Sequence, residues 1–202
     1  MKREKRRIYR RYVKRFFDVV FACVFLFLLS PVFLIAAIAV RIRLGSPVIF
    51  RQARGGLGGC EFMIFKFRTM TDKRGDDGEL LPDTERLTRF GRFLRRTSID
   101  ELPQLVNILR GEMSFVGPRP QLAEFLPYYT EAEKVRHSVR PGFTGLAQVH
   151  GRNSLEWKKR FELDAEYVER VSFWLDLKIM FLTVVTLFRG DNNTESRGFF
   201  DR

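Results

Sequence analysis

Two adjacent carboxylates, Asp100 and Glu101, are the residues of this 202-residue chain best suited to chemistry. Carboxylates just before a helix N-terminus are electrostatically favoured, and their oxygens could also hold Mg²⁺. The alternative is a structural role, because Ser98 and Glu101 have the spacing of a helix capping box. Pro103 argues against capping, since proline disfavours helical geometry at Leu102 and so predicts a helix that begins after the acid pair. On spacing alone, catalysis and capping both stay open.

Basic side chains elsewhere in the chain are candidate phosphate ligands: Lys66, Arg68, Arg95, Arg96, Arg119 and Arg152. The planar guanidinium group matches the geometry of phosphate oxygens and can bind them through two hydrogen bonds. Arg119 stands between two prolines, which restrict its backbone and so lower the entropy cost of ordering it on binding. The other interpretation is that these are ordinary solvated surface residues. Together with the acid pair, they favour chemistry on a phosphorylated substrate.

An apolar run from Phe16 to Val40 is interrupted only by Asp18, Ser30 and Pro31. As one helix it would extend about 37 Å, enough to cross a hydrocarbon core of about 30 Å. Pro31 removes the hydrogen bond to the carbonyl of Phe27, which predicts a break. Ser30 could satisfy a carbonyl freed one turn back, which would stabilise a kink in apolar surroundings. A spanning helix and a re-entrant helix broken at Ser30-Pro31 are both compatible with these residues.

The formal net charge of +12 is concentrated at the N-terminus. Residues 1–15 contain nine Lys or Arg and one acid, Glu4. Next to an apolar run, such an arm is typical of binding to anionic lipid, where each basic residue contributes roughly 1 kcal/mol. Arg41 and Arg43 make the far end of the run basic as well, and a helix that returns to the same face would place both basic ends at one surface. A nucleic-acid-binding protein would leave the apolar run unexplained.

The rest of the chain predicts an α+β, mostly helical domain with a short β-hairpin and interfacial amphipathic helices. The hairpin is expected from residues 48–50 and 61–67 around a glycine-rich loop. Helices are expected over 86–96, 103–109, 155–169 and 173–188. The last is too short in its charge-free part to span a membrane. The chain divides into a basic arm (1–15), an apolar run (16–40), a domain (41–190) and a tail (191–202).

Several ordered blocks make the chain resemble the bacterial monotopic polyprenyl-phosphate phosphoglycosyl transferases, small sugar transferases that initiate glycoconjugate and polysaccharide biosynthesis. The resemblance extends from about residue 12 to about residue 190. The blocks are Ser30-Pro31, VIFRQAR (48–54), FKFRTM (65–70), DELPQL (100–105), GEMSFVGPRP (111–120), RPGFTGLAQV (140–149) and GRN (151–153).

This resemblance implies that Asp100 attacks the β-phosphate of a UDP-sugar and that undecaprenyl phosphate then displaces the covalent phosphosugar. It further implies that Asp100 and Glu101 hold Mg²⁺, that residues 16–40 are a re-entrant membrane helix and that 41–190 are a catalytic domain. The residues implied in substrate binding are Lys66, Arg95, Arg119, Gln148 and Arg152. Because UDP-sugars are cytoplasmic, both termini are expected on the cytoplasmic face of the bacterial inner membrane. The rival hypothesis is a non-catalytic membrane-surface adaptor, in which Asp100 would only cap a helix.

Overall fold

The computed structural model describes residues 2–151 and 155–189, and the chain divides into two compact units. The first unit comprises Met1–Phe21, Ala53–Phe62 and Ile108–Arg202, and the second comprises Ala22–Gln52 and Met63–Asn107. The structure is mostly helical with two small sheets, which confirms the α+β prediction. Arg152 and the tail 191–202 lie outside the described residues.

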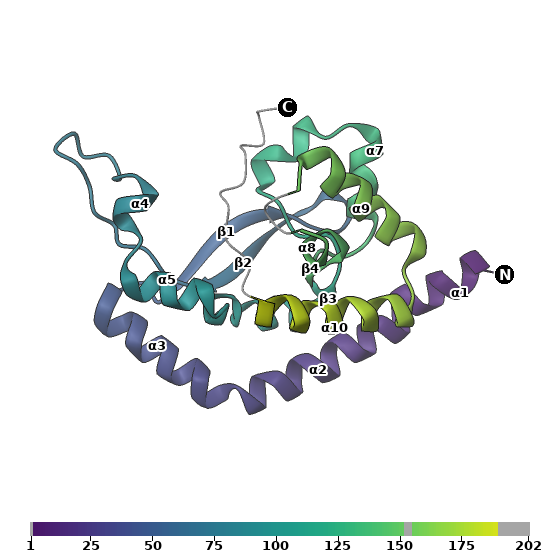
Figure 1. Ribbon diagram of the computed structural model, residues 1–202, viewed down its shortest axis with the longest axis horizontal. Helices are drawn as coiled ribbons and strands as arrows, with labels where there is room; N and C mark the ends of the chain where they lie inside the picture. Colours follow the sequence, from purple (N-terminus) through teal and green to yellow (C-terminus); the bar gives the residue numbers. More distant parts are fainter. Residues whose placement is uncertain (1, 152–154, 190–202) are drawn as a thin grey trace. The chain divides into compact units, whose positions relative to one another are not determined.

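The apolar run forms two helices, α2 (Lys14–Leu28) and α3 (Ser30–Leu44), with a bend between them (Figure 1). Ser30 Oγ donates to the carbonyl of Phe27 at 2.8 Å, as the sequence predicted for a broken helix. No single helix in the described ranges has the length and composition to cross a membrane. Together, the helical stretches Arg6–Leu28 and Ser30–Leu44 have that length and composition, and the bend of 64° between them is compatible with a broken span or a re-entrant loop.

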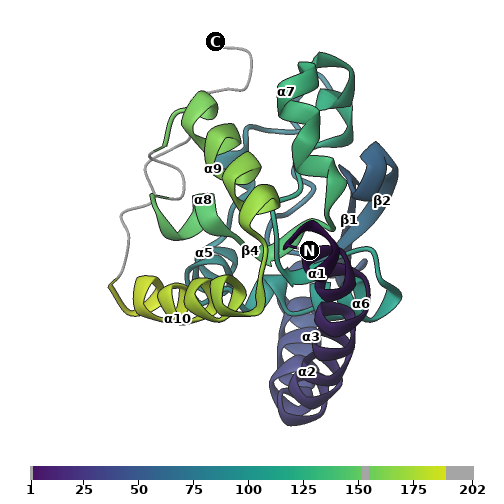
Figure 2. The same ribbon diagram turned by 90° about the vertical axis from the view of Figure 1, so that its right-hand side faces the viewer.

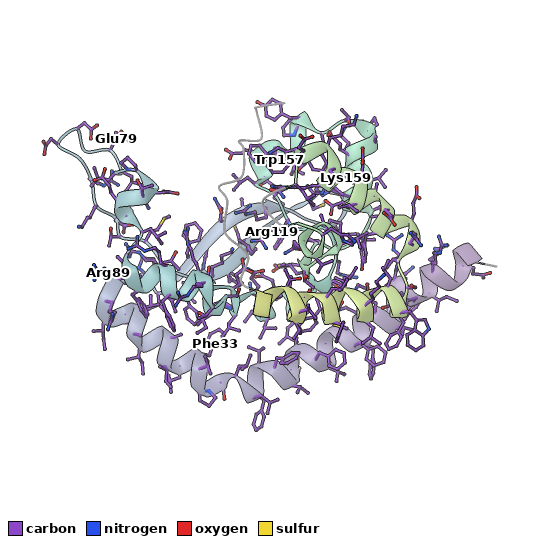
Figure 3. The ribbon with its side chains drawn as sticks, in the orientation of Figure 1. Phe33, Glu79, Arg89, Arg119, Trp157 and Lys159 are labelled. Atoms are coloured by element: carbon purple, nitrogen blue, oxygen red, sulfur yellow. The ribbon has the colours of Figure 1, made fainter. Side chains whose placement is uncertain are left out.

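The second unit has its apolar core where α3 packs on a strand and a short helix. Strands β1 (Ile49–Gly55) and β2 (Glu61–Phe67) are consecutive and paired, which confirms the predicted hairpin. The fully or almost fully buried members of this core are Ala36, Val40, Phe67 and Leu94. Phe33, labelled in Figure 3, places its ring 5.0 Å from that of Phe67. This core therefore joins α3, the end of β2 and α5 (Arg89–Arg96).

The helix predicted over residues 86–96 is two elements, α4 (Asp83–Arg86) and α5. Leu87 and Thr88 between them are extended, and the Thr88 hydroxyl accepts the backbone N–H of Gly91 at 2.9 Å. Threonine is a favourable N-cap, so the helix restarts there. The predicted amphipathic face is confirmed at Leu94, which is 2% exposed. The helix expected over 103–109 is α6 (Gln104–Arg110), followed by Gly111 at φ 82°.

The first unit contains a small parallel sheet that the sequence analysis did not predict. Strands β3 (Ser114–Val116) and β4 (Gly142–Thr144) pair in parallel, with Ser114 opposite Gly142. A Cβ at Gly142 would lie 2.1 Å from the backbone N of Gly117, so only glycine permits this approach. Around the sheet lie α8 (Leu146–Val149), α9 (Trp157–Arg170) and α10 (Phe173–Arg189) (Figure 2). Helix α9 matches the prediction over 155–169, and α10 matches 173–188.

The remaining elements of the first unit are short. Helix α7 (Glu131–Lys134) lies between two 3-10 turns, Ala123–Tyr128 and Val135–Ser138, and a third 3-10 turn covers Leu57–Gly59. The N-terminal arm is helical as α1 (Lys2–Ile8) and a π-helical turn (Tyr9–Val13).

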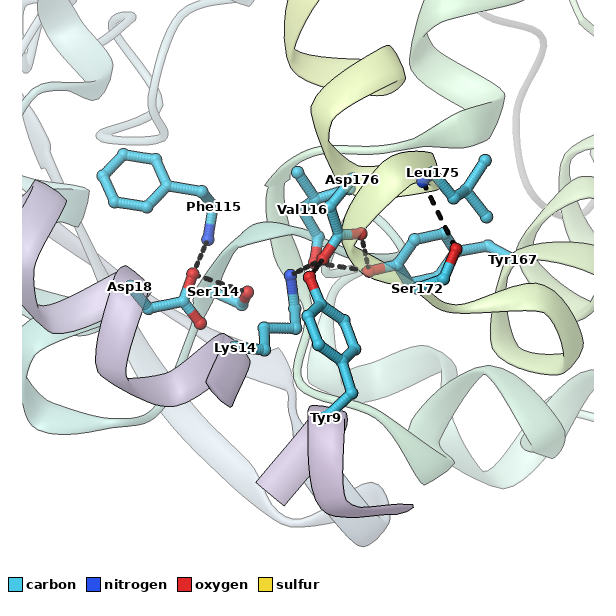
Figure 4. A network of polar contacts seen from close by, with 10 residues as sticks. All are labelled: Tyr9, Lys14, Asp18, Ser114, Phe115, Val116, Tyr167, Ser172, Leu175 and Asp176. Carbon is cyan, nitrogen blue, oxygen red and sulfur yellow. Dashed lines mark hydrogen bonds and ion pairs between the residues drawn. The ribbon is translucent and has the colours of Figure 1, made fainter. Parts of the chain in front are cut away.

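A polar network fixes the N-terminal helices within the first unit (Figure 4). The carboxylate of Asp176 accepts hydrogen bonds from Tyr9 Oη at 2.6 Å, Lys14 Nζ at 2.7 Å and Tyr167 Oη at 2.7 Å. One turn after Lys14, Asp18 Oδ1 accepts from Ser114 Oγ at 3.0 Å and from the backbone N–H of Phe115 at 3.1 Å. These two hydrogen bonds to β3 explain why a carboxylate is tolerated at position 18 of the apolar run.

Candidate active site

The acid pair lies in a tight turn of the second unit. Asp100 and Glu101 belong to the 3-10 turn Ile99–Glu101, which precedes α6. Ser98 has left-handed backbone geometry (φ 55°, ψ 17°), which is uncommon for a residue other than glycine. Its side chain makes no capping hydrogen bond, so the capping-box interpretation of Ser98 and Glu101 is wrong. The expectation that Leu102 avoids helical geometry is also wrong, because its φ is −51° and its ψ −37°.

The pair is poorly exposed and lies beside a cation. Asp100 is 7% exposed, and the Glu101 side chain is 15% exposed. Lys66 of β2 donates from Nζ to Glu101 Oε1 at 2.7 Å. Burying a carboxylate is costly unless charge and hydrogen bonds compensate it, and this ion pair does so for Glu101. Lys66 was predicted as a phosphate ligand; an ammonium has three N–H donors, so its contact with Glu101 is compatible with that role.

Asn107 of α6 holds the strand that carries Lys66. Its Oδ1 accepts the backbone N–H of Phe65 at 3.0 Å, and its Nδ2 donates to the carbonyl of Met63 at 2.8 Å. Asn107 is completely buried. Because α6 follows the acid pair directly, these two bonds set the position of Lys66 relative to Glu101. The sequence analysis missed Asn107; the signal was an amide among the apolar residues of a short helix.

Arg95 of α5 is placed by the residues after β2. Its Nε donates to the hydroxyl of Thr69 at 3.1 Å. A Cβ at Gly91 would lie 1.9 Å from the carbonyl oxygen of Thr69, so glycine is required for α5 to approach this segment. Arg95 is exposed, and in the described part of the chain its two terminal nitrogens have no partner. It therefore belongs to the same unit as the acid pair and has donors that can reach a ligand.

Arg68 was also considered as a phosphate ligand, but its contacts are within the fold. Its guanidinium donates to the carbonyls of Met70 at 2.9 Å and Ser46 at 2.8 Å, and it pairs with Asp72 at 2.5 Å. At 8% exposure, Arg68 joins its own stretch, residues 68–72, to the segment at Ser46 within the second unit.

Gln104, the first residue of α6, was not singled out from the sequence as a site residue. It is 3% exposed, and among the described residues its side-chain Nε2 has no hydrogen-bond partner. A buried N–H donor left without an acceptor is uncommon in folded proteins. Gln104 follows Asp100 by four residues, so an unsatisfied donor lies one turn beyond the acid pair.

Two other predicted ligands lie in the first unit. Arg119 (labelled in Figure 3) is exposed between the buried Pro118 and Pro120, and its carbonyl accepts from Arg136 Nη2 at 2.7 Å. Gln148 donates from Nε2 to the carbonyl of Phe143 at 3.3 Å, and its buried Oε1 has no partner within the described ranges.

The acid pair suits a magnesium ion by its donor chemistry. Mg²⁺ prefers oxygen ligands and is often bound by one or two carboxylates together with water and substrate phosphates. Asp100 and Glu101 supply two carboxylates, and no group of three or more potential ligands among His, Cys, Asp and Glu occurs in the described part of the chain. An ion held by these two carboxylates would need further oxygen ligands from water or substrate.

A family model described as "Bacterial sugar transferase" matches residues 9–190. The match includes the bent helix pair, the acid pair and the predicted phosphate ligands. The chain belongs to the bacterial sugar transferase family.

Curated relatives of this sugar transferase support the same assignment. It is 54% identical over 172 residues, 85% of each chain, to "Uncharacterized sugar transferase EpsL" of Bacillus subtilis. It is 44% identical over 189 residues to the UDP-glucose:undecaprenyl-phosphate glucose-1-phosphate transferase of Caulobacter vibrioides, with 89% of this chain and 71% of the relative covered. It is 41% identical over 197 residues to the exopolysaccharide production protein ExoY of Rhizobium meliloti, and the aligned region covers 88% of this chain and 87% of the relative.

Proposed function

We propose that this sugar transferase moves a sugar 1-phosphate from a UDP-sugar to undecaprenyl phosphate, releasing UMP and forming an undecaprenyl-diphosphate-sugar. Family membership and the named activity of the Caulobacter relative support the reaction class. The observation that carries the proposal is the acid pair: Asp100 is 7% exposed in a turn that follows a left-handed Ser98, beside a Glu101 fixed by Lys66.

The proposed reaction has two displacements at one phosphorus atom. A carboxylate oxygen of Asp100 attacks the β-phosphorus of the UDP-sugar, and the bond from that phosphorus to the bridging oxygen breaks. UMP leaves with the bonding electron pair, and the sugar phosphate is held as an acyl phosphate. An oxygen of undecaprenyl phosphate then attacks the same phosphorus and releases the Asp100 carboxylate. A covalent carboxylate intermediate divides one difficult transfer into two easier steps.

The other residues orient charge around this phosphorus. Asp100 and Glu101 would hold Mg²⁺, which supplies charge stabilisation for the diphosphate. Lys66 fixes Glu101 and, with Arg95, Arg119 and Arg152, would bind phosphate oxygens; Gln148 offers an amide acceptor to the substrate. Preorganised donors of this kind are often the largest contribution to catalysis.

We further propose that residues 16–40 form a re-entrant helix in the inner membrane, with residues 41–190 as the cytoplasmic catalytic domain. The 64° bend and the internal hydrogen bond of Ser30 support this topology. Single cysteines placed before Arg10 and after Phe188, in a background without Cys23 and Cys60, should both react with a membrane-impermeant reagent only from the cytoplasmic side. Labelling from opposite sides would instead establish a spanning helix.

The reaction is tested by measuring UMP release from a set of UDP-sugars with purified full-length protein and undecaprenyl phosphate. One or more sugars should support turnover, and a labelled sugar phosphate should remain on the wild-type protein when the lipid acceptor is omitted. Absence of turnover with every UDP-sugar would favour the membrane adaptor. Turnover by an Asp100→Asn variant would contradict the covalent mechanism.

A further inference from the structure

The backbone on both sides of Arg119 is held by main-chain hydrogen bonds. Among residues 118–120, Arg119 is exposed and the two prolines are buried. The carbonyl of Pro118 accepts the backbone N–H of Gly142 at 2.9 Å. The carbonyl of Gln121 accepts the backbone N–H of Gly55 at 3.0 Å. An exposed side chain on a backbone that is fixed on both sides loses little backbone freedom when it binds a ligand.

The carbonyl of Arg119 itself is held by a buried side chain. Arg136 donates to it from Nη2 at 2.7 Å, and the same nitrogen pairs with Asp164 Oδ2 of α9 at 2.9 Å. Nη1 of Arg136 donates to Tyr129 Oη at 3.0 Å. The side chains of Arg136 and Asp164 are only 3% and 4% exposed. One buried nitrogen therefore connects a carboxylate of α9 to the residue that is proposed to bind phosphate.

Two aromatic rings pack against the guanidinium group of Arg136. Its Cζ lies 5.6 Å from the centre of the Tyr129 ring and 5.2 Å from the centre of the Phe161 ring. The two rings contact each other edge to face at 5.5 Å, and both are buried in an apolar cluster with Phe125. This packing leaves Arg136 few alternative positions and so fixes where its Nη2 meets the Arg119 carbonyl.

Stability alone does not explain this buried ion pair. Burial raises the pKa of Asp164 to about 6, even though the charges of Arg136 and Arg160 act to lower it. The folded protein therefore disfavours the carboxylate by desolvation more than its partners favour it. Apolar side chains of similar size can often replace a buried ion pair without loss of stability, because the desolvation of two charges is costly. The hydrogen bond that Arg136 directs to Arg119 gives the pair a role other than stability.

We propose that the Arg136–Asp164 pair positions Arg119 for binding the diphosphate of the UDP-sugar, an inference that rests on the proposed function. Asp164 orients the guanidinium group of Arg136, and Arg136 in turn holds the Arg119 carbonyl. Arg119 then presents its side chain to the substrate from a fixed backbone. Arg136 and Asp164 are buried and act through Arg119, so they are positioning residues. All three residues belong to the first unit.

The test measures binding of UDP, the part common to every UDP-sugar, to the purified full-length protein by isothermal titration calorimetry in detergent with Mg²⁺. Arg136→Met with Asp164→Leu should keep the melting temperature close to that of the wild type, because apolar side chains replace both charges. UDP affinity should fall about threefold to tenfold, because Arg119 must then be ordered when it binds. The matched control, Arg170→Met with Glu166→Leu, removes an exposed ion pair of α9 and should leave UDP affinity unchanged.

Coupling to Arg119 separates positioning from a purely structural role. In an Arg119→Ala background, the double change at Arg136 and Asp164 should have no further effect on UDP affinity, because the side chain that the pair positions is absent. An equal loss of affinity with and without the Arg119 side chain would overturn the proposal. Arg136→Lys keeps a charge beside Asp164 but not the planar fork of donors, so it gives the same comparison if the double variant does not fold.

Turnover of UDP-sugars is measured separately, so the two proposals can fail independently. Wild-type protein that binds UDP but transfers no sugar phosphate would contradict the proposed reaction, and UDP binding alone would then decide the positioning role. Wild-type protein that does not bind UDP, or whose UDP affinity is unchanged by Arg119→Ala, would overturn the positioning role even if sugar transfer is observed.

Discussion

Two buried acidic centres, Asp176 in the first unit and Asp100-Glu101 in the second, are built in different ways. Both oxygens of Asp176 accept hydrogen bonds, and its donors come from the π-helical turn, α2 and α9. Asp100 and Glu101 instead occupy one turn that follows a left-handed serine, with Lys66 against Glu101. The first arrangement joins segments distant in sequence, and the second places two adjacent carboxylates at the start of a helix. Burial alone therefore does not identify a catalytic acid.

Tyr167 shows why the Asp176 centre is structural. Burial, followed by the nearby charge of Asp176, raises the pKa of Tyr167 well above its usual value. Its hydroxyl thus stays protonated and remains a donor, and its single hydrogen faces both Asp176 Oδ1 at 2.7 Å and the carbonyl of Val116 at 3.0 Å. A carboxylate that accepts from a tyrosine whose pKa is raised in this way is suited to holding a fold together.

The largest difference in turnover between the two centres should come from comparing Asp100→Asn with Asp176→Asn. This change removes the proposed nucleophile while preserving size, and loss of a covalent nucleophile lowers turnover by on the order of 10⁴-fold or more. UMP release per folded molecule measures it. The matched Asp176→Asn variant should keep turnover in its folded fraction within about tenfold of the wild type. Comparable activity losses in the two folded proteins would erase the distinction between the centres.

For the free energy of unfolding, we expect the larger loss at the Asp176 centre rather than at Asp100-Glu101. Asp176→Ala leaves Lys14 and the Tyr9 hydroxyl without this acceptor, and removing one partner of a buried ion pair costs about 3–5 kcal/mol of unfolding free energy. Denaturant unfolding in detergent measures this loss. Glu131→Ala breaks an exposed ion pair with Lys134 and should cost less than about 1 kcal/mol. An Asp176 effect no larger than that of Glu131 would show that the network contributes little.

Lys66→Met should affect activity more than stability. It removes the cation that fixes Glu101, and a charge-assisted hydrogen bond contributes about 1.5–3 kcal/mol, equivalent to a roughly tenfold to hundredfold loss of turnover. Lys66→Arg retains the charge and should recover part of the activity. If Met and Arg behave alike in the UMP assay, the charge at this position is not what matters.

The smallest expected effect concerns the left-handed residue. Ser98→Gly should raise the unfolding free energy by up to about 1 kcal/mol, because glycine adopts φ 55° without the steric cost. The neighbouring Thr97 has an ordinary right-handed conformation. Thr97→Gly should therefore lower the same quantity by about 0.5–1 kcal/mol. Destabilisation by both changes would mean that Ser98 is not strained.

Local chemistry was the part of the fold that the sequence predicted well. The break at Ser30-Pro31 depends on the missing N–H of one proline and the hydroxyl beside it, and it was found with the expected bond to Phe27. The start of α5 was misplaced by three residues, because Arg86 fits the same amphipathic pattern as α5. The cap at Thr88 ends that ambiguity.

Tertiary contacts could not be predicted in this way. Strands β3 and β4 have three residues each, too few for a recognisable alternation, and their pairing depends on the close approach of Gly117 and Gly142. Of the site, the acid pair and Lys66 were singled out from their chemistry, but the ion pair between Lys66 and Glu101 was not predicted. Asn107 and Gln104 were missed because a helical amide has the same sequence signature whether it is buried or solvated.

The two polar breaks in the apolar run differ in when they can be satisfied during synthesis. Ser30 finds its acceptor three residues earlier, so this hydrogen bond needs no residue that is synthesised later. Asp18 must wait for Ser114, which is translated 96 residues later. The nascent chain can thus form its bent helix pair first, while the carboxylate of Asp18 remains available until Ser114 has been synthesised.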